Sequence, residues 1–191
     1  MTPFVAQRAM ALKSIITLPD RRLRLKCDPV AAVDDEIRKL MDDMLETMYD
    51  APGIGLAAIQ IAVPKRVMVI DIARREDEQA PANPLFIANP EILWASEEES
   101  CYEEGCLSIP DFREEVFRPA SIKFAYLDRQ GKRQEMDAEG LLATCVQHEI
   151  DHLNGVLFID HISRLKRDRI LKKFNKSAKR GNEQTSATTE S

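Results

Sequence analysis

The segment CVQHEIDHLNG, Cys145 to Gly155, contains two of the three histidines in this chain, and a glutamate directly follows the first of them. His148 and His152 are four residues apart, so on a helix both imidazoles lie on the same face, one turn apart. This is the spacing of the HExxH motif, in which two histidines bind a metal ion and the glutamate acts as general base. Because the motif is short, polar residues on an ordinary surface helix can also produce it. The interpretation as a metal site therefore depends on whether the chain offers a third ligand.

Several residues are candidates for this third ligand. A catalytic zinc-like site uses three protein ligands and keeps one position for water. His161 lies beyond Asn154-Gly155, which is expected to end the helix. It therefore cannot share the helical face of the other two histidines. Cys106, in EEGCLSIP, is the better candidate because a thiolate is an ordinary ligand of a divalent ion, and Pro110 is expected to end regular structure there. Cys145 is the strongest competitor, since it lies three residues before His148. The remaining cysteines also stay open as ligands: Cys27 and Cys101.

Length and composition indicate an ordinary globular protein. A chain of 191 residues can bury about 70% of its unfolded surface, and 44% hydrophobic with 31% charged residues is a usual balance. There is no run of eighteen apolar residues to predict a transmembrane helix, and the N-terminus lacks the pattern of a signal peptide. We therefore expect a cytoplasmic protein whose cysteines are thiols or ligands rather than disulfides. The net charge of −5 argues weakly against general nucleic-acid binding.

The apolar pattern predicts an α+β fold, in which antiparallel or mixed sheets pack around a central helix that carries HExxH. A further helix is expected near the C-terminal end. In chain order, the expected elements are a helix from Asp34 or Asp35 to Pro52, strands at 67–71 and 85–94 with an interruption at Pro90, antiparallel strands at 115–128 and 132–140, and helices at 140–154 and 163–176.

Three blocks of sequence occur in an order that resembles the peptide deformylases. They are GIGLAAIQ at Gly53–Gln60, EGCLS at Glu104–Ser108 and QHEIDH at Gln147–His152, and the resemblance extends from about Lys13 to Lys176. HExxH alone is shared with many metalloproteases, whereas the three blocks together are far more specific. The resemblance implies a metal-dependent hydrolase that removes the N-formyl group from the N-terminal formyl-methionine of newly synthesised polypeptides and releases formate. It also implies a single catalytic domain, which we place at residues 1–176. The sequence itself suggests an irregular lead-in at 1–13 and a polar, disordered tail at 177–191, because the tail lacks the apolar surface needed to fold.

The same resemblance assigns roles to particular residues. It implies that Cys106, His148 and His152 bind one divalent ion per chain, natively Fe²⁺, which Zn²⁺, Ni²⁺ or Co²⁺ can replace; the ligand types alone do not choose among these metals. A metal-bound water would attack the formyl carbon, with Glu149 as general acid and base. The side chain of Gln60 and the backbone N–H of Leu107 would stabilise the oxyanion.

The resemblance further implies that the substrate binds as an added strand beside GIGLAAIQ, with its methionine side chain in an apolar pocket. Glu104 is expected to pair with Arg118. The residues expected to contact or surround the substrate are Gly53, Ile54, Gly55, Glu104, Gly105, Arg113, Leu141 and Cys145.

Residues 163–180 carry nine Lys or Arg residues against one Asp. A solvated amphipathic helix explains this charge as well as a functional surface does. The functional interpretation, implied by some members of the family, is a contact with ribosomal RNA that places the enzyme near emerging chains. We expect formylated nascent peptides as partners, no membrane, and a monomer.

Two other classes of protein share part of this pattern. A metal-dependent endopeptidase would also use HExxH, but its third ligand is usually His or Glu rather than an upstream Cys. A structural metal site would need a fourth protein ligand, such as Cys101 or Cys145.

Overall fold

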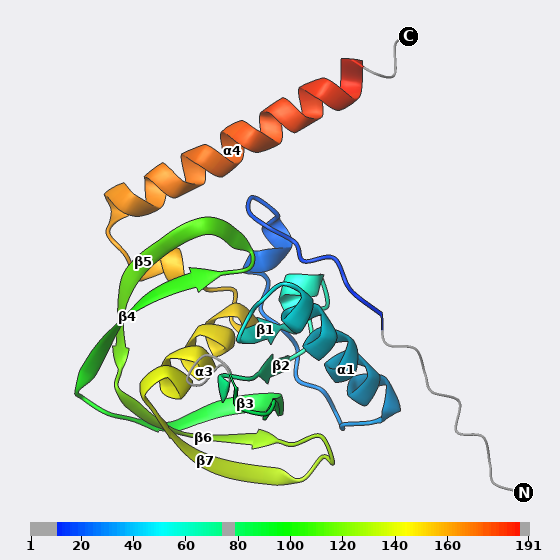
Figure 1. Ribbon diagram of the computed structural model, residues 1–191, viewed down its shortest axis with the longest axis vertical. Helices are drawn as coiled ribbons and strands as arrows, with labels where there is room; N and C mark the ends of the chain where they lie inside the picture. Colours follow the sequence, from blue (N-terminus) through cyan, green and yellow to red (C-terminus); the bar gives the residue numbers. More distant parts are fainter. Residues whose placement is uncertain (1–10, 74–78, 188–191) are drawn as a thin grey trace, which may run out of the picture.

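A computed structural model describes residues 11–73 and 79–187 of the chain. It contains a five-stranded antiparallel sheet in the order β1-β2-β3-β6-β7 and a separate two-stranded ribbon, β4-β5 (Figure 1). The α+β class is therefore confirmed. The strands of the sheet are β1 (Gly55–Ala57), β2 (Val67–Ile70), β3 (Leu85–Ala95), β6 (Ser121–Leu127) and β7 (Arg133–Glu139), and those of the ribbon are β4 (Glu99–Cys106) and β5 (Ile109–Pro119).

The helices pack around these strands. In Figure 1, α3 lies between the ribbon and the large sheet, α1 covers one end of that sheet, and α4 runs past the ribbon. Short 3₁₀ helices connect the strands and helices. The bounds are α1 (Asp35–Asp50), α3 (Gly140–Leu153) and α4 (Arg164–Ala187), with 3₁₀ helices η1 (Arg21–Arg24), η2 (Ala58–Ile61) and η3 (Phe158–Asp160).

Local sequence explains where α1 and α3 begin and end. The Asp34 side chain accepts the N–H of Ile37 and caps α1, as predicted. Gly140 opens α3 with a φ of 57° directly after β7. Gly155 follows α3 with a φ of 77°, and a Cβ there would lie 2.4 Å from the carbonyl oxygen of Arg24. Only glycine fits this position, so the chain must leave the helix after Asn154.

The two prolines in the predicted strands differ in outcome. Strand pairing is interrupted at Pro90, as predicted: the register with β6 shifts between Ala88 and Glu91, although β3 continues as one strand on both sides of this bulge. Pro110 does not end regular structure, since it lies within β5. The register between β4 and β5 shifts here, since Cys106 pairs with Ile109 and Gly105 with Arg113, so Pro110 falls at an irregularity in an edge ladder, where proline is tolerated.

The end of the chain also differs from the prediction. α4 continues past Lys176 to Ala187, through part of the expected tail. The added stretch, SAKRGNEQTSA, has no proline to break the helix, and six of its eleven residues are Ala, Lys, Arg, Glu or Gln, which are good helix formers. Residues 1–10 of the expected lead-in and residues 188–191 of the expected tail lie outside the described residues.

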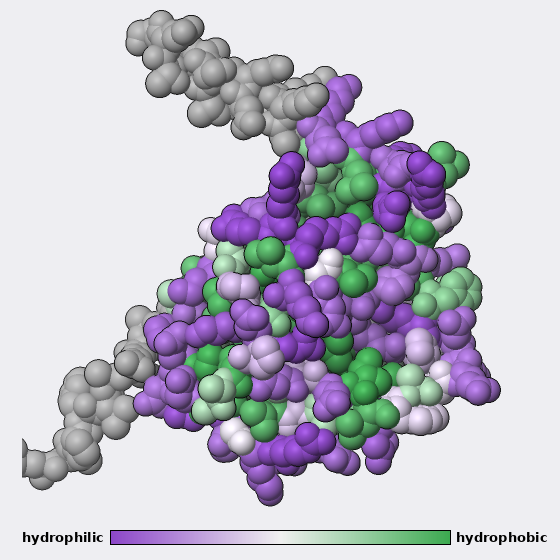
Figure 2. Space-filling view, turned by 180° about the vertical axis from the view of Figure 1, so that it is seen from behind, coloured by the Kyte–Doolittle hydropathy of each residue, from purple (hydrophilic) through white to green (hydrophobic). Residues whose placement is uncertain are grey.

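The face of the molecule opposite to that in Figure 1 is mainly polar. On the face seen from behind, hydrophobic residues form small groups separated by hydrophilic ones (Figure 2), as on most globular proteins. None of the helices in the described ranges has the length and apolar content needed to span a bilayer.

Candidate active site

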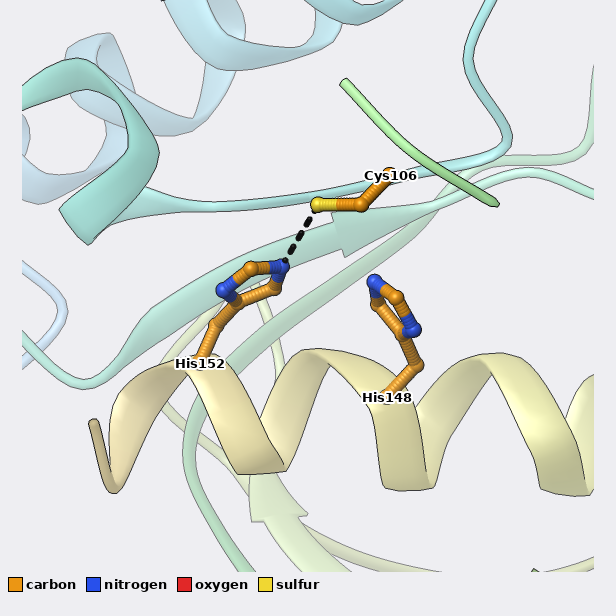
Figure 3. A group of neighbouring side chains, drawn as sticks. All are labelled: Cys106, His148 and His152. Atoms are coloured by element: carbon orange, nitrogen blue, oxygen red, sulfur yellow. Dashed lines mark hydrogen bonds between the residues drawn. The ribbon is translucent and has the colours of Figure 1, made fainter. Parts of the chain in front are cut away.

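The two histidines of HExxH do share one face of α3. Their rings are 5.0 Å apart between centroids, and both point toward Cys106 at the end of β4 (Figure 3). The Nε2 atom of His152 lies 3.2 Å from Cys106 Sγ. Within the described part of the chain, Cys106, His148 and His152 form a group whose potential ligand atoms all lie within 4.8 Å of one another. The structure therefore brings together the three residues proposed as ligands.

A buried carboxylate orients His148. Glu104 Oε2 lies 2.8 Å from Nδ1 of His148. An ionised carboxylate can only accept hydrogen bonds, so Nδ1 carries a proton, and Nε2 is the ring nitrogen that would bind a metal ion once the charged ring has lost its second proton. Burial alone would raise the pKa of Glu104, but hydrogen bonds from His148 and Arg118 outweigh this effect and lower it from 4.5 to about 2. The carboxylate is therefore ionised throughout the neutral range.

Arg118 holds Glu104 in turn. The Nε and Nη2 atoms of its guanidinium donate to the two oxygens of Glu104, at 2.5 and 3.1 Å, and Nη1 donates to Asp151 at 2.8 Å. Glu104 and Arg118 are almost completely buried, so the predicted ion pair is present in a setting where the loss of one partner is costly. Glu104 lines the cavity, but its oxygens are used by Arg118 and His148 rather than left free for a substrate.

The donor set fits a divalent metal ion. Burial, followed by the charge of His148, lowers the pKa of His152 well below its ordinary value, so this ring stays neutral. Neutral imidazoles and a cysteine sulfur are the usual ligands of zinc and related metals. Two buried polar atoms beside the group, Nδ1 of His152 and Oε2 of Glu149, have no hydrogen-bond partner among the described residues.

Glu149 lies on α3 against β1. It is almost fully buried, and burial raises its pKa from 4.5 to about 7, although the charge of His148 opposes this shift. A carboxyl group with a pKa near neutral pH can both accept and return a proton. Gly55 makes room for it, because a Cβ at that position would lie 2.3 Å from Glu149 Oε1. The glycine in GIGLAAIQ is therefore required by the close approach of β1 to this carboxyl group.

The amide of Gln60 has a defined orientation. Its Oε1 atom accepts the N–H of Ala57 at 2.8 Å, so Nε2 must face the opposite side. Nε2 donates to Ser108 Oγ at 3.2 Å and lies 3.6 Å from Cys106 Sγ. A donor group of an almost completely buried side chain thus points toward the proposed metal ligands. Leu107, the other proposed donor, lies in the turn between β4 and β5.

These side chains surround a cavity of about 460 Å³. Nearly all residues expected at the site line it; His152 is the exception, because it is buried behind the cavity wall. The expected residues that line the cavity are Gly53, Ile54, Gly55, Gln60, Glu104, Gly105, Cys106, Leu107, Arg113, Leu141, Cys145, His148 and Glu149.

The sequence did not predict one wall of this cavity. Gly105 pairs with Arg113 across the ribbon, and a Cβ on Gly105 would lie 3.3 Å from Cγ of Arg113. This pairing brings the start of β5 alongside the end of β4. The lining residues that the sequence analysis missed are Pro52, Tyr102, Glu103, Ile109, Pro110, Asp111, Phe112 and Thr144. Recognising 99–119 as a hairpin would have identified most of them.

Among the described residues, the other cysteines and the third histidine lie outside the Cys-His-His group, although Cys145 lines the cavity. Cys145 Sγ donates to the carbonyl oxygen of Ile54 at 3.8 Å, Cys27 is buried in the core, and Cys101 is exposed on β4. His161 pairs with Asp151, at 2.7 Å from Nε2 to Oδ2.

Comparisons with known proteins identify the family. Residues 12–168 match the model of the polypeptide deformylase family. A peptide deformylase from Methylocella silvestris is 71% identical over 89% of this chain and 87% of its own length. The crystal structure of peptide deformylase from Ehrlichia chaffeensis superimposes with a TM-score of 0.82 at 41% identity, over 90% of this chain and 99% of that one. A Met-Ala-Ser-bound peptide deformylase from Acinetobacter baumannii gives 0.75 at 37% identity, over 81% and 100%. The chain with this buried Cys-His-His group belongs to the polypeptide deformylase family.

Proposed function

We propose that the residues around this cavity divide the hydrolysis of an N-formyl amide among themselves. As a member of its family, the chain is a hydrolase that removes the formyl group from N-formylmethionyl polypeptides. One observation carries the assignment of roles to residues. Cys106 and His148 of the Cys-His-His group, the side chain of Glu149 and the side chain of Gln60 line the same cavity, and His152 lies within ligand distance of the first two.

Cys106, His148 and His152 would hold one divalent ion, with Glu104 fixing the ring of His148. We propose Fe²⁺ as the native ion, replaceable by Zn²⁺, Ni²⁺ or Co²⁺, because imidazole and thiolate accept all of these metals. When bound, such an ion polarises a carbonyl group and lowers the pKa of a water molecule to about 7.

Glu149 would handle the proton of the reaction. A water oxygen attacks the formyl carbon as a carboxyl oxygen of Glu149 accepts the water's proton. Glu149 then returns this proton to the methionine nitrogen and the C–N bond breaks. The products are formate and a peptide with a free N-terminal amine. Meanwhile Nε2 of Gln60 and the N–H of Leu107 donate hydrogen bonds to the formyl oxygen as its negative charge develops.

The peptide would bind along β1. This strand is at the edge of the five-stranded sheet, beside the cavity, so its free backbone groups can pair with an extended peptide. Ile54, Leu107, Leu141 and Cys145 would form the apolar surface for the methionine side chain. The Met-Ala-Ser bound to the relative from Acinetobacter baumannii supports a peptide ligand of this kind.

Formate release from formyl-Met-Ala-Ser tests this function. Protein loaded with Fe²⁺ in the absence of oxygen should release formate from this peptide, and acetyl-Met-Ala-Ser should remain intact because the space proposed beside the three ligands would fit a formyl group but crowd an acetyl group. Equal hydrolysis of both peptides would contradict the proposed selectivity. Cleavage of internal bonds in unformylated peptides would instead support the endopeptidase alternative.

We also propose that the enzyme works in the cytoplasm as a monomer and uses α4 to contact ribosomal RNA. Much of the charge on this helix is already paired within the protein: Lys166 and Arg169 reach Glu114 at 2.6 and 3.7 Å, and Arg167 reaches Asp160 at 3.9 Å. The exposed residues Lys172 and Lys176 are therefore the better candidates for contact with phosphate.

Reversing the charge of Lys172 and Lys176 together should weaken binding to ribosomes. Each lost phosphate contact should reduce the slope of log affinity against log salt by about 0.7–0.9. Ribosome co-sedimentation at several salt concentrations measures this slope. The matched control is the pair Lys26→Glu and Lys132→Glu, which changes the net charge equally on exposed residues elsewhere. Hydrolysis of short formyl peptides should be the same in both variants, and equal ribosome affinity in both would contradict the contact.

A further inference from the structure

The apolar face of α1 contains two buried polar residues that the proposed reaction does not use. Asp43 and Thr47 are each only 3% exposed and lie on the helix beside the buried Met44 and Met48. Burying a polar side chain is costly unless it finds hydrogen-bond partners. Here the partners belong to a segment near the N-terminus, residues 11–18, which we call the N-terminal strap.

The first half of the strap is attached to α1. The N–H of Ala11 donates to Asp43 Oδ1 and the N–H of Lys13 donates to Thr47 Oγ1, both at 3.0 Å. The Nζ atom of Lys13 also lies 3.2 Å from Asp43 Oδ2. Residues 11–14 of the strap are exposed and have no regular secondary structure. Asp43 and Thr47 therefore fix a segment that would otherwise have few contacts.

The second half of the strap is attached to the site. The N–H of Ile16 donates to the backbone carbonyl of Gln60 at 2.8 Å, and the N–H of Leu18 donates to that of Ser108 at 3.0 Å. Gln60 and Ser108 are 48 residues apart in sequence and are also joined through their side chains. The strap thus joins the backbone of the two segments that carry the proposed oxyanion donors, the Gln60 amide and the N–H of Leu107.

We propose that the N-terminal strap positions these two donors and that Asp43 and Thr47 are positioning residues acting through it. Donors stabilise a transition state only when they are fixed where the charge will develop, and a misplacement of about 1 Å can cost about 100-fold in rate. The effect should therefore fall on kcat, because the strap's hydrogen bonds go to the backbone of Gln60 and Ser108 and to α1, and none of them goes to a proposed metal ligand. The inference rests on the proposed role of Gln60.

Thr47→Val and Thr47→Ser form the central comparison. Valine keeps the branched shape but removes the acceptor for Lys13, whereas serine keeps the hydroxyl. We expect Thr47→Val to lower kcat by about tenfold, less than the loss of a whole donor, with KM and metal content unchanged and Thr47→Ser close to the parent. Lys39→Met is the control, since it removes an ion pair with Asp43 but leaves the hydrogen bonds of the strap.

Two further variants distinguish a failure of the strap proposal from a failure of the proposed role of Gln60. Ile16→Pro removes the N–H that binds Gln60 and should lower kcat by itself, while Gln60→Ala tests the donor directly. NMR should show faster amide exchange at Ile16 and Leu18 in Thr47→Val, with shifted signals of the Gln60 side-chain NH₂ group.

A large loss in Gln60→Ala, combined with parental kcat in Thr47→Val and Ile16→Pro, would overturn the inference and leave the proposed function intact. Equal losses in the valine and serine variants would also overturn it, because the hydroxyl would then be irrelevant. A parental rate in Gln60→Ala would remove the oxyanion role of this residue and the inference with it.

Discussion

Replacing Glu149 with glutamine should lower kcat for formate release by about 10²–10⁴-fold, the usual contribution of a general acid and base. Glutamine has the same shape but can neither take the proton from water nor return it to the leaving nitrogen. The carboxyl group lies close to β1, where Gly55 leaves room for it, and Oε2 has no other hydrogen-bond partner among the described residues.

Metal content and stability separate this effect from damage to the site. Glu149 is not one of the three clustered ligands, so Glu149→Gln should bind the same amount of metal as the parent. Burial raises the pKa of Glu149 to about 7, which means that the fold disfavours its ionised form above that pH. A neutral amide should therefore unfold at the same or a higher denaturant concentration in metal-free protein at pH 8. A kcat within threefold of the parent would exclude Glu149 as the proton carrier.

Local spacing was sufficient to predict part of this site. The four-residue spacing of His148 and His152 fixes their common face wherever the segment is helical. The Asp34 cap and the Asn-Gly stop are likewise local signals, and α1 and α3 begin and end within about a residue or two of their predicted bounds.

Contacts between distant segments could not be predicted in this way. Cys106 and His152 are 46 residues apart, and nothing in their spacing favours Cys106 over Cys145, which is closer along the chain. Only the resemblance of three blocks chose between them. The link from Asp151 through Arg118 and Glu104 to His148 depends on how the ribbon packs against α3.

The missed wall of the cavity has a different cause. Pro110 suggested an end to regular structure and the next strand was expected only from residue 115, yet 109–119 form one long strand of the ribbon. In a two-stranded ribbon that exposes part of its surface, neither proline nor charge opposes strand formation. The apolar alternation used to predict strands is weak in such a segment, although it borders the substrate cavity.

Replacing Cys106 with alanine should lower metal affinity by more than about 100-fold, because changes in residues that merely support a metal ligand already cost about 10–100-fold. Two imidazoles one helical turn apart would remain, without the sulfur that closes the group. Metal content after dialysis against a chelator measures the loss directly. Formate release should fall in parallel, and added Zn²⁺ or Co²⁺ should restore little of it.

Matched cysteine substitutions distinguish this catalytic arrangement from a structural metal site. Cys101→Ser changes an exposed thiol on the same strand, and Cys145→Ser changes the thiol that is closest in sequence to the histidines. Both variants should keep one ion per chain, because only Cys106 lies within ligand distance of His148 and His152 in the described structure. A closed site with four protein ligands would instead lose its ion in one of them. If Cys101→Ser and Cys145→Ser both retain the ion and Cys106→Ala loses it, the site has three protein ligands. Its fourth position is then open for the water that the reaction consumes.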